Sequence, residues 1–363
     1  MKYKENELAL LWIDSFLNLS YYDKQYLYSL IKGKEHIKSV LEGNSIEIIE
    51  KVTKEAFDQI INSANREYFA SIIGELEEKG ITAITAESEN YPTSLLETDE
   101  PPLVLYAMGN LSLLENDLFG IVGSRKTLPL SVSIAKDYTK TLVEAGLTIV
   151  TGIAQGIDKA VIESALGSGK LISVIAGGFD NIYPKSHTQL FNEVVDRGLV
   201  ISEQPPKVVP QPFNFPRRNR IISALSRGVL IVSGAKKSGT LYTAEYAEIY
   251  GKDVFAVPYS IGTASGEGCN ELIKKGASLT DTPKDILDFY GLEVKEEKEQ
   301  LPKEEQIIVN VLKDGALHIN LICEKTNKDI VEVTTLISML VIKGIVVKSG
   351  TNVYGLTRKI SED

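Results

Sequence analysis

The sequence predicts an α/β protein built on a doubly wound, mostly parallel sheet, with a helical module before it and a small domain after it. The main observation is that short β-branched, apolar runs alternate with segments of helical pattern across residues 85–291. These runs are apolar along their whole length, as in strands that helices cover on both faces. With right-handed crossovers, this order of elements gives a Rossmann-like domain.

The expected strands and helices follow one another along this region. Strands are expected at 119–124, 147–152, 171–178, 199–203, 229–234 and 253–258. Helices fit between them, for example at 131–145, 157–167, 187–196, 217–226 and 240–250. In a doubly wound sheet the carboxyl ends of the strands share one edge, and ligands bind there.

Two segments flank this domain. Residues 1–84 have apolar positions at helical spacing and indicate a helical (SAM-like) module. We expect this module to brace the next domain rather than to bind a partner. Residues 292–303 are highly charged and contain one proline, which is typical of a linker.

The last segment, residues 304–363, has the pattern of three helices and a hairpin. The helices are expected at 304–313, 318–325 and 329–343, and the strands at 345–349 and 352–356. This is the order of elements in a winged-helix domain.

Composition excludes several classes of protein. The chain has 363 residues, is 43% hydrophobic, and is acidic, with 39 Lys+Arg against 49 Asp+Glu. Its two cysteines, Cys269 and Cys323, form no CxxC pattern, and its three histidines are scattered, so we expect a reducing compartment, no metal and no cofactor. No apolar run approaches the roughly 20 residues that span a bilayer. Asp14 interrupts the N-terminal apolar stretch, so no signal peptide is expected either. The sequence therefore predicts a cytoplasmic protein.

One stretch departs from the acidic balance. Residues 207–237 carry seven positive side chains and no carboxylate. They are Lys207, Arg217, Arg218, Arg220, Arg227, Lys236 and Lys237. Such a cluster suggests a polyanion partner, although a solvated basic face is the alternative interpretation. Phe215 lies inside the densest part, and an aromatic ring can stack on an unpaired base while arginine binds phosphate.

Glycine-rich loops follow the expected strands. Gly123-Ser124-Arg125 follows the first, TGIAQGID with Gly152 and Gly156 follows the second, and SGAKKSGT follows the strand at 229–234. Glycines let backbone amides approach a phosphate, and a following helix N-terminus favours an anion. Each loop alone is also compatible with an ordinary tight turn. The dinucleotide signature GxGxxG and the Walker A pattern are both missing.

Evidence for catalysis is weak. The acidic residues near these loops, Asp158, Asp180 and Glu245, are not paired at an informative spacing, and no Ser/His/Asp or Cys/His set is evident. Asp158 is expected to cap its helix. Arg218 has an alternative structural role, which is an ion pair with Glu203.

Together these motifs resemble those of the DNA-processing protein A (DprA/Smf) family. The resemblance is carried, in order, by GSR, TGIAQGID, IAGGFDNIYP, ISE, FPRRNRIISALS, KSGTLYTAEYA, DVFAVP and GCNELIKKGA. It implies a protein that binds single-stranded DNA, protects incoming DNA in natural transformation, loads the recombinase RecA, and forms a homodimer through its Rossmann-like domain. A candidate dimer contact is the apolar side of 269–280, with Leu272, Ile273 and Leu279. Two positions depart from the family pattern, namely Ile153 in place of a glycine and Tyr259 after Val257-Pro258.

The residue patterns and the resemblance together give one set of candidate DNA-binding residues. These are Gly123, Ser124, Arg125, Gly156, Lys185, Phe215, Arg217, Arg218, Asn219, Arg220, Lys236, Lys237, Ser238, Gly239 and Thr240. By resemblance, Arg125 belongs to the phosphate-contacting GSR loop, and Lys185 follows the YP dipeptide.

Two other hypotheses remain open. SGAKKSGT followed by Glu245 loosely resembles the loop of nucleoside-monophosphate phosphoribohydrolases, which would make the protein an enzyme. The C-terminal domain could instead be a repressor module for duplex DNA. It carries seven Lys+Arg against eight Asp+Glu, and Asp329 and Glu332 stand near the start of its expected recognition helix. That is a poor phosphate surface, so a protein-contact role is favoured.

Overall fold

The computed structural model describes residues 3–17, 19–32, 66–294, 301–313 and 315–356. Contacts divide the chain into two compact units, Met1–Lys295 and Glu296–Asp363. Each unit is described separately below. The limits predicted for the N-terminal module, the linker and the C-terminal domain stay predictions, and residues 33–65 of that module lie outside the described residues.

The first unit is built on a nine-stranded sheet with the order β1-β2-β6-β5-β4-β3-β7-β8-β9. Its strands are β1 (Thr82–Thr85), β2 (Val104–Gly109), β3 (Leu118–Gly123), β4 (Thr148–Thr151), β5 (Leu171–Val174), β6 (Leu199–Ser202), β7 (Gly228–Ser233), β8 (Asp253–Ala256) and β9 (Ser278–Leu279). The strands from β6 to β9 run parallel. Strands β2 and β1 extend the sheet antiparallel at the β6 edge. The predicted α/β fold with a parallel sheet is confirmed, and the antiparallel strands β1 and β2 and the short parallel strand β9 are additions to it.

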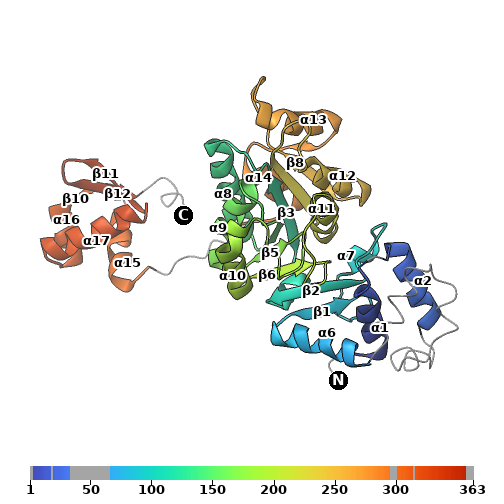
Figure 1. The fold of residues 1–363 in the computed structure, drawn as a ribbon. Coiled ribbons are helices and arrows are strands. Elements are labelled where there is room, and N and C mark those ends of the chain that lie inside the picture. The colour runs from blue at the N-terminus through green and yellow to red at the C-terminus, as the bar shows by residue number, and fades with distance from the viewer. Residues whose placement is uncertain (1–2, 18, 33–65, 295–300, 314, 357–363) are drawn as a thin grey trace. The chain divides into compact units, whose positions relative to one another are not determined.

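Helices cover both faces of this sheet, as the continuous apolar strands require (Figure 1). One face packs against α8 (Pro129–Glu144), α9 (Ile157–Ala165), α10 (Thr188–Arg197) and α14 (Pro283–Tyr290). The other packs against α7 (Thr93–Leu96), α11 (Asn214–Leu225), α12 (Leu241–Ile249) and α13 (Glu267–Lys275). Helix α11 begins three residues earlier than expected, because Pro216 fits its first turn, where no amide hydrogen bond is lost.

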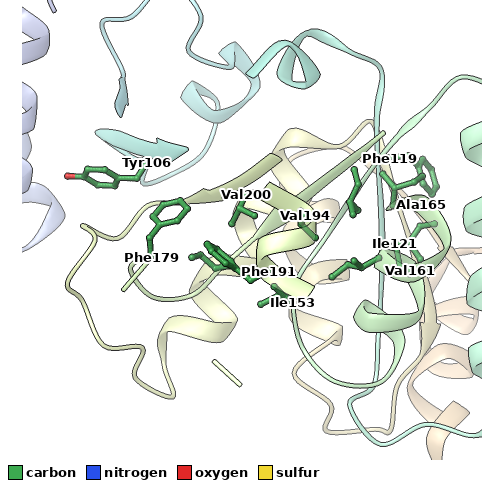
Figure 2. Close-up of a cluster of buried hydrophobic side chains, with 14 of the residues drawn as sticks. Tyr106, Phe119, Ile121, Ile153, Val161, Ala165, Phe179, Phe191, Val194 and Val200 are labelled. Carbon is green, nitrogen blue, oxygen red and sulfur yellow. The ribbon is translucent and has the colours of Figure 1, made fainter. Parts of the chain in front are cut away.

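The core on the α8–α10 face shows how tightly the layers pack. Phe119 and Ile121 of β3 lie in the same buried cluster as Val161 and Ala165 of α9 (Figure 2). All four side chains are fully buried or nearly so. The close approach of β3 to α9 fixes where the loop after β3 leaves the sheet.

The order of the strands creates a switch point. From β3 the chain builds the sheet in one direction through β4, β5 and β6, and it then returns to place β7 on the other side of β3. The loops after β3 and β7 therefore leave the sheet in opposite directions, and a crevice opens between them.

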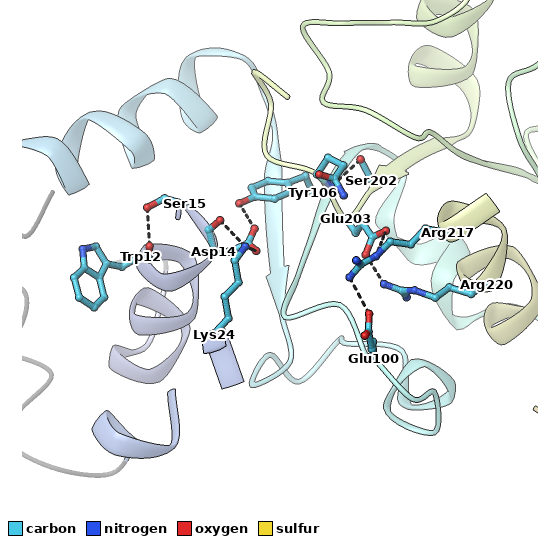
Figure 3. Close-up of polar contacts among 11 residues, drawn as sticks. Trp12, Asp14, Ser15, Lys24, Glu100, Tyr106, Ser202, Glu203, Arg217 and Arg220 are labelled. Carbon is cyan, nitrogen blue, oxygen red and sulfur yellow. Dashed lines mark hydrogen bonds and ion pairs between the residues drawn. The ribbon is translucent and has the colours of Figure 1, made fainter. Parts of the chain in front are cut away.

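The N-terminal helices lie at the antiparallel edge. They are α1 (Glu5–Asp14), α2 (Tyr21–Ile31) and α6 (Arg66–Glu78). Leu10, Leu11 and Ile13 of α1 are fully buried in the same core as the sheet. The Asp14 carboxylate pairs with Lys24 of α2 at 2.9 Å and accepts a hydrogen bond from the Tyr106 hydroxyl of β2 at 2.9 Å (Figure 3). One carboxylate thus joins two helices to the sheet.

The second unit contains α15 (Lys303–Leu312), α16 (Ile319–Thr326) and α17 (Ile330–Ile342). A small antiparallel sheet of β10 (Leu317–His318), β12 (Val353–Leu356) and β11 (Val346–Gly350) completes it. Apolar residues of all three helices form its core. Strand β10 was not expected from the sequence, and the winged-helix assignment stays a prediction. Among the described helices of either unit, none has the length and apolar character that crossing a bilayer requires.

We predict that Asp14→Ala lowers the free energy of unfolding by roughly 3–5 kcal/mol. It leaves the buried Tyr106 hydroxyl without its acceptor and removes the counter-ion of Lys24, which keeps only its hydrogen bond to the backbone carbonyl of residue 14. Urea unfolding monitored by circular dichroism would measure this loss. The matched control is Lys4→Gln, which breaks the exposed pair with Glu89 and should have much less effect. Equal effects of the two substitutions would contradict the role given to Asp14.

Candidate nucleic-acid interface

A groove of about 880 Å³ lies at the switch point, beyond the carboxyl ends of β3 and β7. Six segments that are far apart in the sequence line it. They are the loops after β3, β4, β5 and β8, the start of α11 with the residues before it, and the loop between β7 and α12. Of the candidate residues, those in the groove lining are Gly123, Ser124, Arg125, Phe215, Arg218, Asn219, Lys237, Ser238, Gly239 and Thr240.

Helix α11 supplies three of these side chains from one face. Phe215, Arg218 and Asn219 have the spacing of neighbours on a helix surface. The Asn219 amide donates a hydrogen bond to the Gly239 carbonyl at 3.2 Å, so it ties α11 to the loop that precedes α12. The FPxRN motif of α11 and the KSGT motif of the loop before α12 therefore lie side by side in one wall of the groove.

A buried charge pair supports this wall from below. Arg218 is only 6% exposed and Asp158 only 5%. The Arg218 guanidinium donates to the Val174 carbonyl at the end of β5. Burial raises the pKa of Asp158, and Arg218 opposes that rise; burial lowers the pKa of Arg218, and Asp158 opposes that fall. The expected ion pair of Arg218 with Glu203 is wrong, because Arg217 and Arg220 hold Glu203 instead.

Asp158 also differs from its expected role. Its carboxylate accepts the amide of Ala154 at 3.2 Å in the loop that precedes α9, and the N-cap position of that helix is Gly156. The loop has room for the pair only because position 152 is a glycine. A Cβ atom on Gly152 would overlap Asp158 Oδ2 and lie 2.7 Å from Arg218 Nη2.

An aromatic platform stands beside this wall. The Arg125 guanidinium lies 4.8 Å from the centroid of the Phe215 ring, and the Tyr183 ring meets Phe215 edge-on at 5.5 Å. Tyr183 is 54% exposed. A second hollow of about 230 Å³ adjoins the groove and shares Arg125, Tyr183 and Phe215 with it. Tyr183 was not selected from the sequence, although it stands in the YP dipeptide that precedes Lys185.

The positive charge of the groove comes from fewer residues than the sequence suggested. Arg125, Lys126 and Lys237 line it, are exposed, and form no ion pair within the described ranges. Lys126 was missed because it stands just outside the GSR motif. Lys185 is exposed directly after Pro184, which lines the smaller hollow, but Lys185 itself lines neither hollow.

Most of the cluster at 207–237 is neutralised by carboxylates from elsewhere. Lys207 pairs with Glu75, Arg227 with Asp117, and Lys236 with Glu271. Arg217 and Arg220 share Glu203, and Arg217 also holds Glu100 at 3.1 Å. Of the seven cations, only Lys237 combines exposure with the lack of a partner among the described residues. Counting charges along the sequence therefore overstated the basic surface.

Two glycines of the candidate set act through the backbone. A Cβ atom on Gly123 would lie 2.7 Å from the Ile157 Cβ, where β3 and α9 touch. Gly156 has φ of +81°, and a Cβ atom there would lie 2.6 Å from the Arg125 carbonyl oxygen. Gly156 thus lets the loops after β3 and β4 lie against each other.

The two departures from the family pattern are also packed. Ile153 is 3% exposed, and its carbonyl contacts His187 Nδ1 at 2.8 Å. The Tyr259 hydroxyl donates to the Val232 carbonyl of β7 at 2.8 Å and contacts the Ser131 hydroxyl. Both side chains therefore fill the structure beneath the loops.

Chemistry other than binding would require a metal site or a general acid or base in the groove. Within the described residues there is no group of three His, Cys, Asp or Glu side chains that could hold a metal ion. Glu245, which the enzyme hypothesis requires, is exposed on α12 and does not line the groove.

Comparisons with known proteins agree with one another. Residues 82–291 match the family model described as DNA recombination-mediator protein A. The chain is 39% identical over 219 residues to the DNA processing protein DprA of Bacillus subtilis strain 168, covering 60% of this chain and 74% of that protein. It is 40% identical over 215 residues to the protein Smf of Escherichia coli K12, covering 59% of this chain and 58% of that one.

Two solved structures are similar as well. The X-ray structure of DNA processing protein A from Streptococcus pneumoniae aligns with a TM-score of 0.61 and 30% identity, over 79% of this chain and 98% of that one. The structure of DNA processing protein A from Helicobacter pylori, described for its single-stranded DNA binding mode, aligns with a TM-score of 0.54 and 30% identity. That alignment covers 58% of this chain and 95% of the other.

We predict that Gly152→Ala destabilises the protein by about 1–3 kcal/mol, because the added methyl group forces the buried Asp158 and Arg218 side chains apart. Thermal or urea unfolding would measure the loss. Gly167→Ala is the matched control, since a Cβ atom there meets nothing within 4 Å. A Gly152→Ala protein as stable as the control would show that the pair can move without cost.

Proposed function

The chain belongs to the DNA recombination-mediator protein A family, and from that premise we propose that it binds single-stranded DNA in the groove between the loops after β3 and β7. The observation that carries this proposal is the platform of the half-buried Phe215 and the exposed Tyr183. It is framed by Arg125, Lys126 and Lys237, which have no ion pair in the described part of the chain. The relative from Helicobacter pylori, whose described subject is its single-stranded DNA binding mode, supports it.

The chemistry of the groove favours unpaired strands. A base that is not stacked in a duplex can lie against Phe215 or Tyr183, and this contact accepts any base because every base has a π face. The cations would take the phosphates that flank it. Of the three side chains that α11 directs to the groove, Arg218 is buried and the Asn219 amide is bonded to the Gly239 carbonyl, so few polar groups remain for base edges. Little sequence preference is therefore expected.

The other candidate residues fit this proposal in different ways. Ser238, Gly239 and Thr240 bring backbone and hydroxyl groups to the groove wall at the start of α12, where an anion is favoured. Ser124 lines the groove from the loop after β3. Gly123 and Gly156 shape the loops. Lys185, Arg217, Arg220 and Lys236 lie outside the groove lining, so contact with DNA would require a strand that extends beyond it.

We further propose the cellular role that the family resemblance implies. The protein would act in the cytoplasm, protect incoming DNA during natural transformation, and load RecA onto the strand without turnover of its own. A loading assay is the direct test, in which this protein should allow RecA to displace a single-strand-binding protein from DNA. If RecA from the same organism gains nothing, the proposal reduces to DNA protection.

A homodimer through the first unit is also proposed. Leu279 is 52% exposed and remains a candidate contact, whereas Leu272 is 6% exposed and is committed to the core. Light scattering at concentrations of tens of micromolar, roughly the range in which a stable interface persists, would test it. A monomer there would leave only a weak association.

For the C-terminal unit we propose a protein-contact role. Helix α17 carries Asp329 and Glu332 at its start and exposes Val331 and Ile342 at 74% and 86%. Acidic and apolar groups make a poor surface for duplex phosphates.

The alternative function is that of a nucleoside-monophosphate phosphoribohydrolase. It requires Glu245 to act on a nucleotide in the groove, but Glu245 is exposed on α12 outside the lining. Incubation with purine nucleoside monophosphates, followed by chromatography of free base, separates the two functions. Base release that Glu245→Gln abolishes would overturn the binding-protein proposal.

We predict that the protein prefers single-stranded DNA over blunt duplex and that its affinity falls steeply with salt. Each phosphate contact on a single strand should contribute about 0.7 log units of affinity per log unit of salt. Fluorescence anisotropy with both DNA forms at several salt concentrations measures this. Equal or tighter binding to the duplex would contradict the platform as the binding surface.

We predict that Arg125→Ala and Lys237→Ala each weaken binding about five- to tenfold, which corresponds to roughly 1–1.4 kcal/mol. Both side chains are exposed in the groove, so the fold should be unaffected. Lys207→Ala is the matched control, because Lys207 lies in the proline-rich segment before α11 and pairs with Glu75. If Lys207→Ala weakens binding most, the DNA does not bind in the groove. Arg218 is unsuited to this comparison because it is buried against Asp158.

A further inference from the structure

A further hollow, distinct from the groove and from the smaller hollow beside it, lies on the opposite side of α11 from the groove. It has a volume of about 280 Å³, which is roughly nine times the share of one water in the liquid. Its walls come from the N-terminal helices, from residues 101–103, from the strap at 203–213 and from α11. We call it the arginine hollow, after Arg217 and Arg220 on its α11 side (Figure 3).

The two arginines are not fully satisfied by the protein. Arg220 is 4% exposed, and its Nη2 pairs with Glu203, while its Nε and Nη1 have no hydrogen-bond partner among the described residues. The Nε of Arg217 is likewise buried without a hydrogen bond, at 3.6 Å from Glu203. Within the hollow the two guanidinium groups share the Glu203 carboxylate, and only the more exposed Arg217 has a second partner, Glu100, among the described residues. A buried charge is normally matched by its own partner, and Arg220 shares its partner with Arg217.

The opposite wall of the hollow is balanced. The Asp14 carboxylate pairs with Lys24 at 2.9 Å and accepts a hydrogen bond from the Tyr106 hydroxyl at 2.9 Å, so its negative charge is already compensated (Figure 3). The lining as a whole contains three cations, Lys24, Arg217 and Arg220, against two carboxylates, Asp14 and Glu203. The unmatched positive charge therefore lies on the α11 side.

Glu100, which does not line the hollow, partly neutralises that positive charge. It holds Arg217 Nη2 at 3.1 Å, and its side chain is 32% exposed. An anion in the hollow would compete with Glu100 for Arg217, while the buried pair of Arg220 with Glu203 stays in place. Removing the Glu100 charge should for this reason strengthen anion binding.

The rim adds an aromatic surface. Phe213 lines the hollow and is 69% exposed, although it is a large apolar side chain. A phosphate on the arginines with a base against Phe213 is the combination that one nucleotide presents. Phe213 stands two residues before Phe215 of the groove, so a single strand that passes over the start of α11 would reach both.

We propose that the arginine hollow is a second phosphate site, in which Arg217 and Arg220 bind the phosphate of one nucleotide whose base lies on Phe213. Its ligand is a phosphate of the DNA strand that leaves the groove, and in this form the inference rests on the proposed function. A free nucleotide would present the same chemistry. The variants below distinguish the two sources.

The test compares full-length variants that change only the hollow. Arg217→Gln removes one guanidinium from a side chain that is 41% exposed, so it avoids the buried Arg220. Glu100→Gln removes the competing charge. Two controls match them: Lys207→Gln removes a paired cation of the strap that does not line the hollow, and Glu97→Gln removes an exposed carboxylate close to Glu100. Thermal melts check that each protein is folded.

With labelled oligothymidylate, we expect Arg217→Gln to weaken binding about three- to tenfold and to reduce the salt slope by about 0.7, as the loss of one phosphate contact requires. Glu100→Gln should tighten binding more than Glu97→Gln, and Lys207→Gln should match the wild type. If Arg217→Gln also matches the wild type while Lys237→Ala weakens binding, the hollow is no DNA site although the groove is.

Calorimetric titration with thymidine monophosphate and with inorganic phosphate tests the other source. Binding that Arg217→Gln abolishes would support the phosphate site with a free nucleotide as its ligand, even if the wild type binds no DNA and the proposed function fails. If these small anions do not bind and oligothymidylate binding is the same in all four hollow and control variants, the inference is overturned.

Discussion

The buried pair of Arg218 and Asp158 is the interaction on which the groove depends. Arg218 comes from α11 and reaches the end of β5, while Asp158 opens α9 and holds the amide of Ala154 in the loop after β4. Two charges out of water are costly unless partners compensate them. Arg218 donates to Val174 and Asn219, Asp158 accepts from Ala154, and the two opposite charges attract each other. Here that requirement fixes the distance between α11 and the edge of the sheet, and Gly152 provides the room. Phe215 and Asn219, which flank Arg218 on the same helix face, are positioned as a consequence.

The charges of the first unit fall into two groups with different work. Lys207, Lys236 and Arg227 are each paired with one carboxylate, while Arg217 and Arg220 share Glu203 beside the arginine hollow. Arg125, Lys126 and Lys237 have no ion pair in the described ranges, and all three face the groove. In a chain of net charge −10, a few unpaired cations at one concave place attract a polyanion more selectively than a broad basic face would. The acidic surroundings thus help to confine the strand to that place.

The sequence predicted the parallel sheet because its strands are buried on both faces and read as continuous apolar runs. It missed β9, which is only two residues long, and it missed β1 and β2. The antiparallel pairing of β1 and β2 follows from the turn of the chain at 85–104 rather than from any periodicity. The groove loops were found because glycines and cations stand together in short motifs. The ion pairs of the cations were not found, because their carboxylate partners lie far away in the sequence. Lys207 pairs with a carboxylate 132 residues earlier, and Arg227 pairs with one 110 residues earlier. Pairing of this kind is a property of the fold.

The N-terminal helices do more than support the antiparallel edge of the sheet, because α6 also contacts segments that lead to the groove. Lys207 of the strap pairs with Glu75 of α6, and Lys79, which directly follows α6, pairs with Glu75 and Asp180. The end of α6 therefore holds both the strap and the loop after β5. These pairs are partly exposed, and salt screens them. Glu203 at the start of the same strap is buried with Arg220, where screening is weak. The strap, which brings Pro210 and Pro212 to the groove, is therefore anchored by a contact that salt does not loosen. The salt dependence of binding then reports contacts with phosphate, while the groove wall itself stays in place.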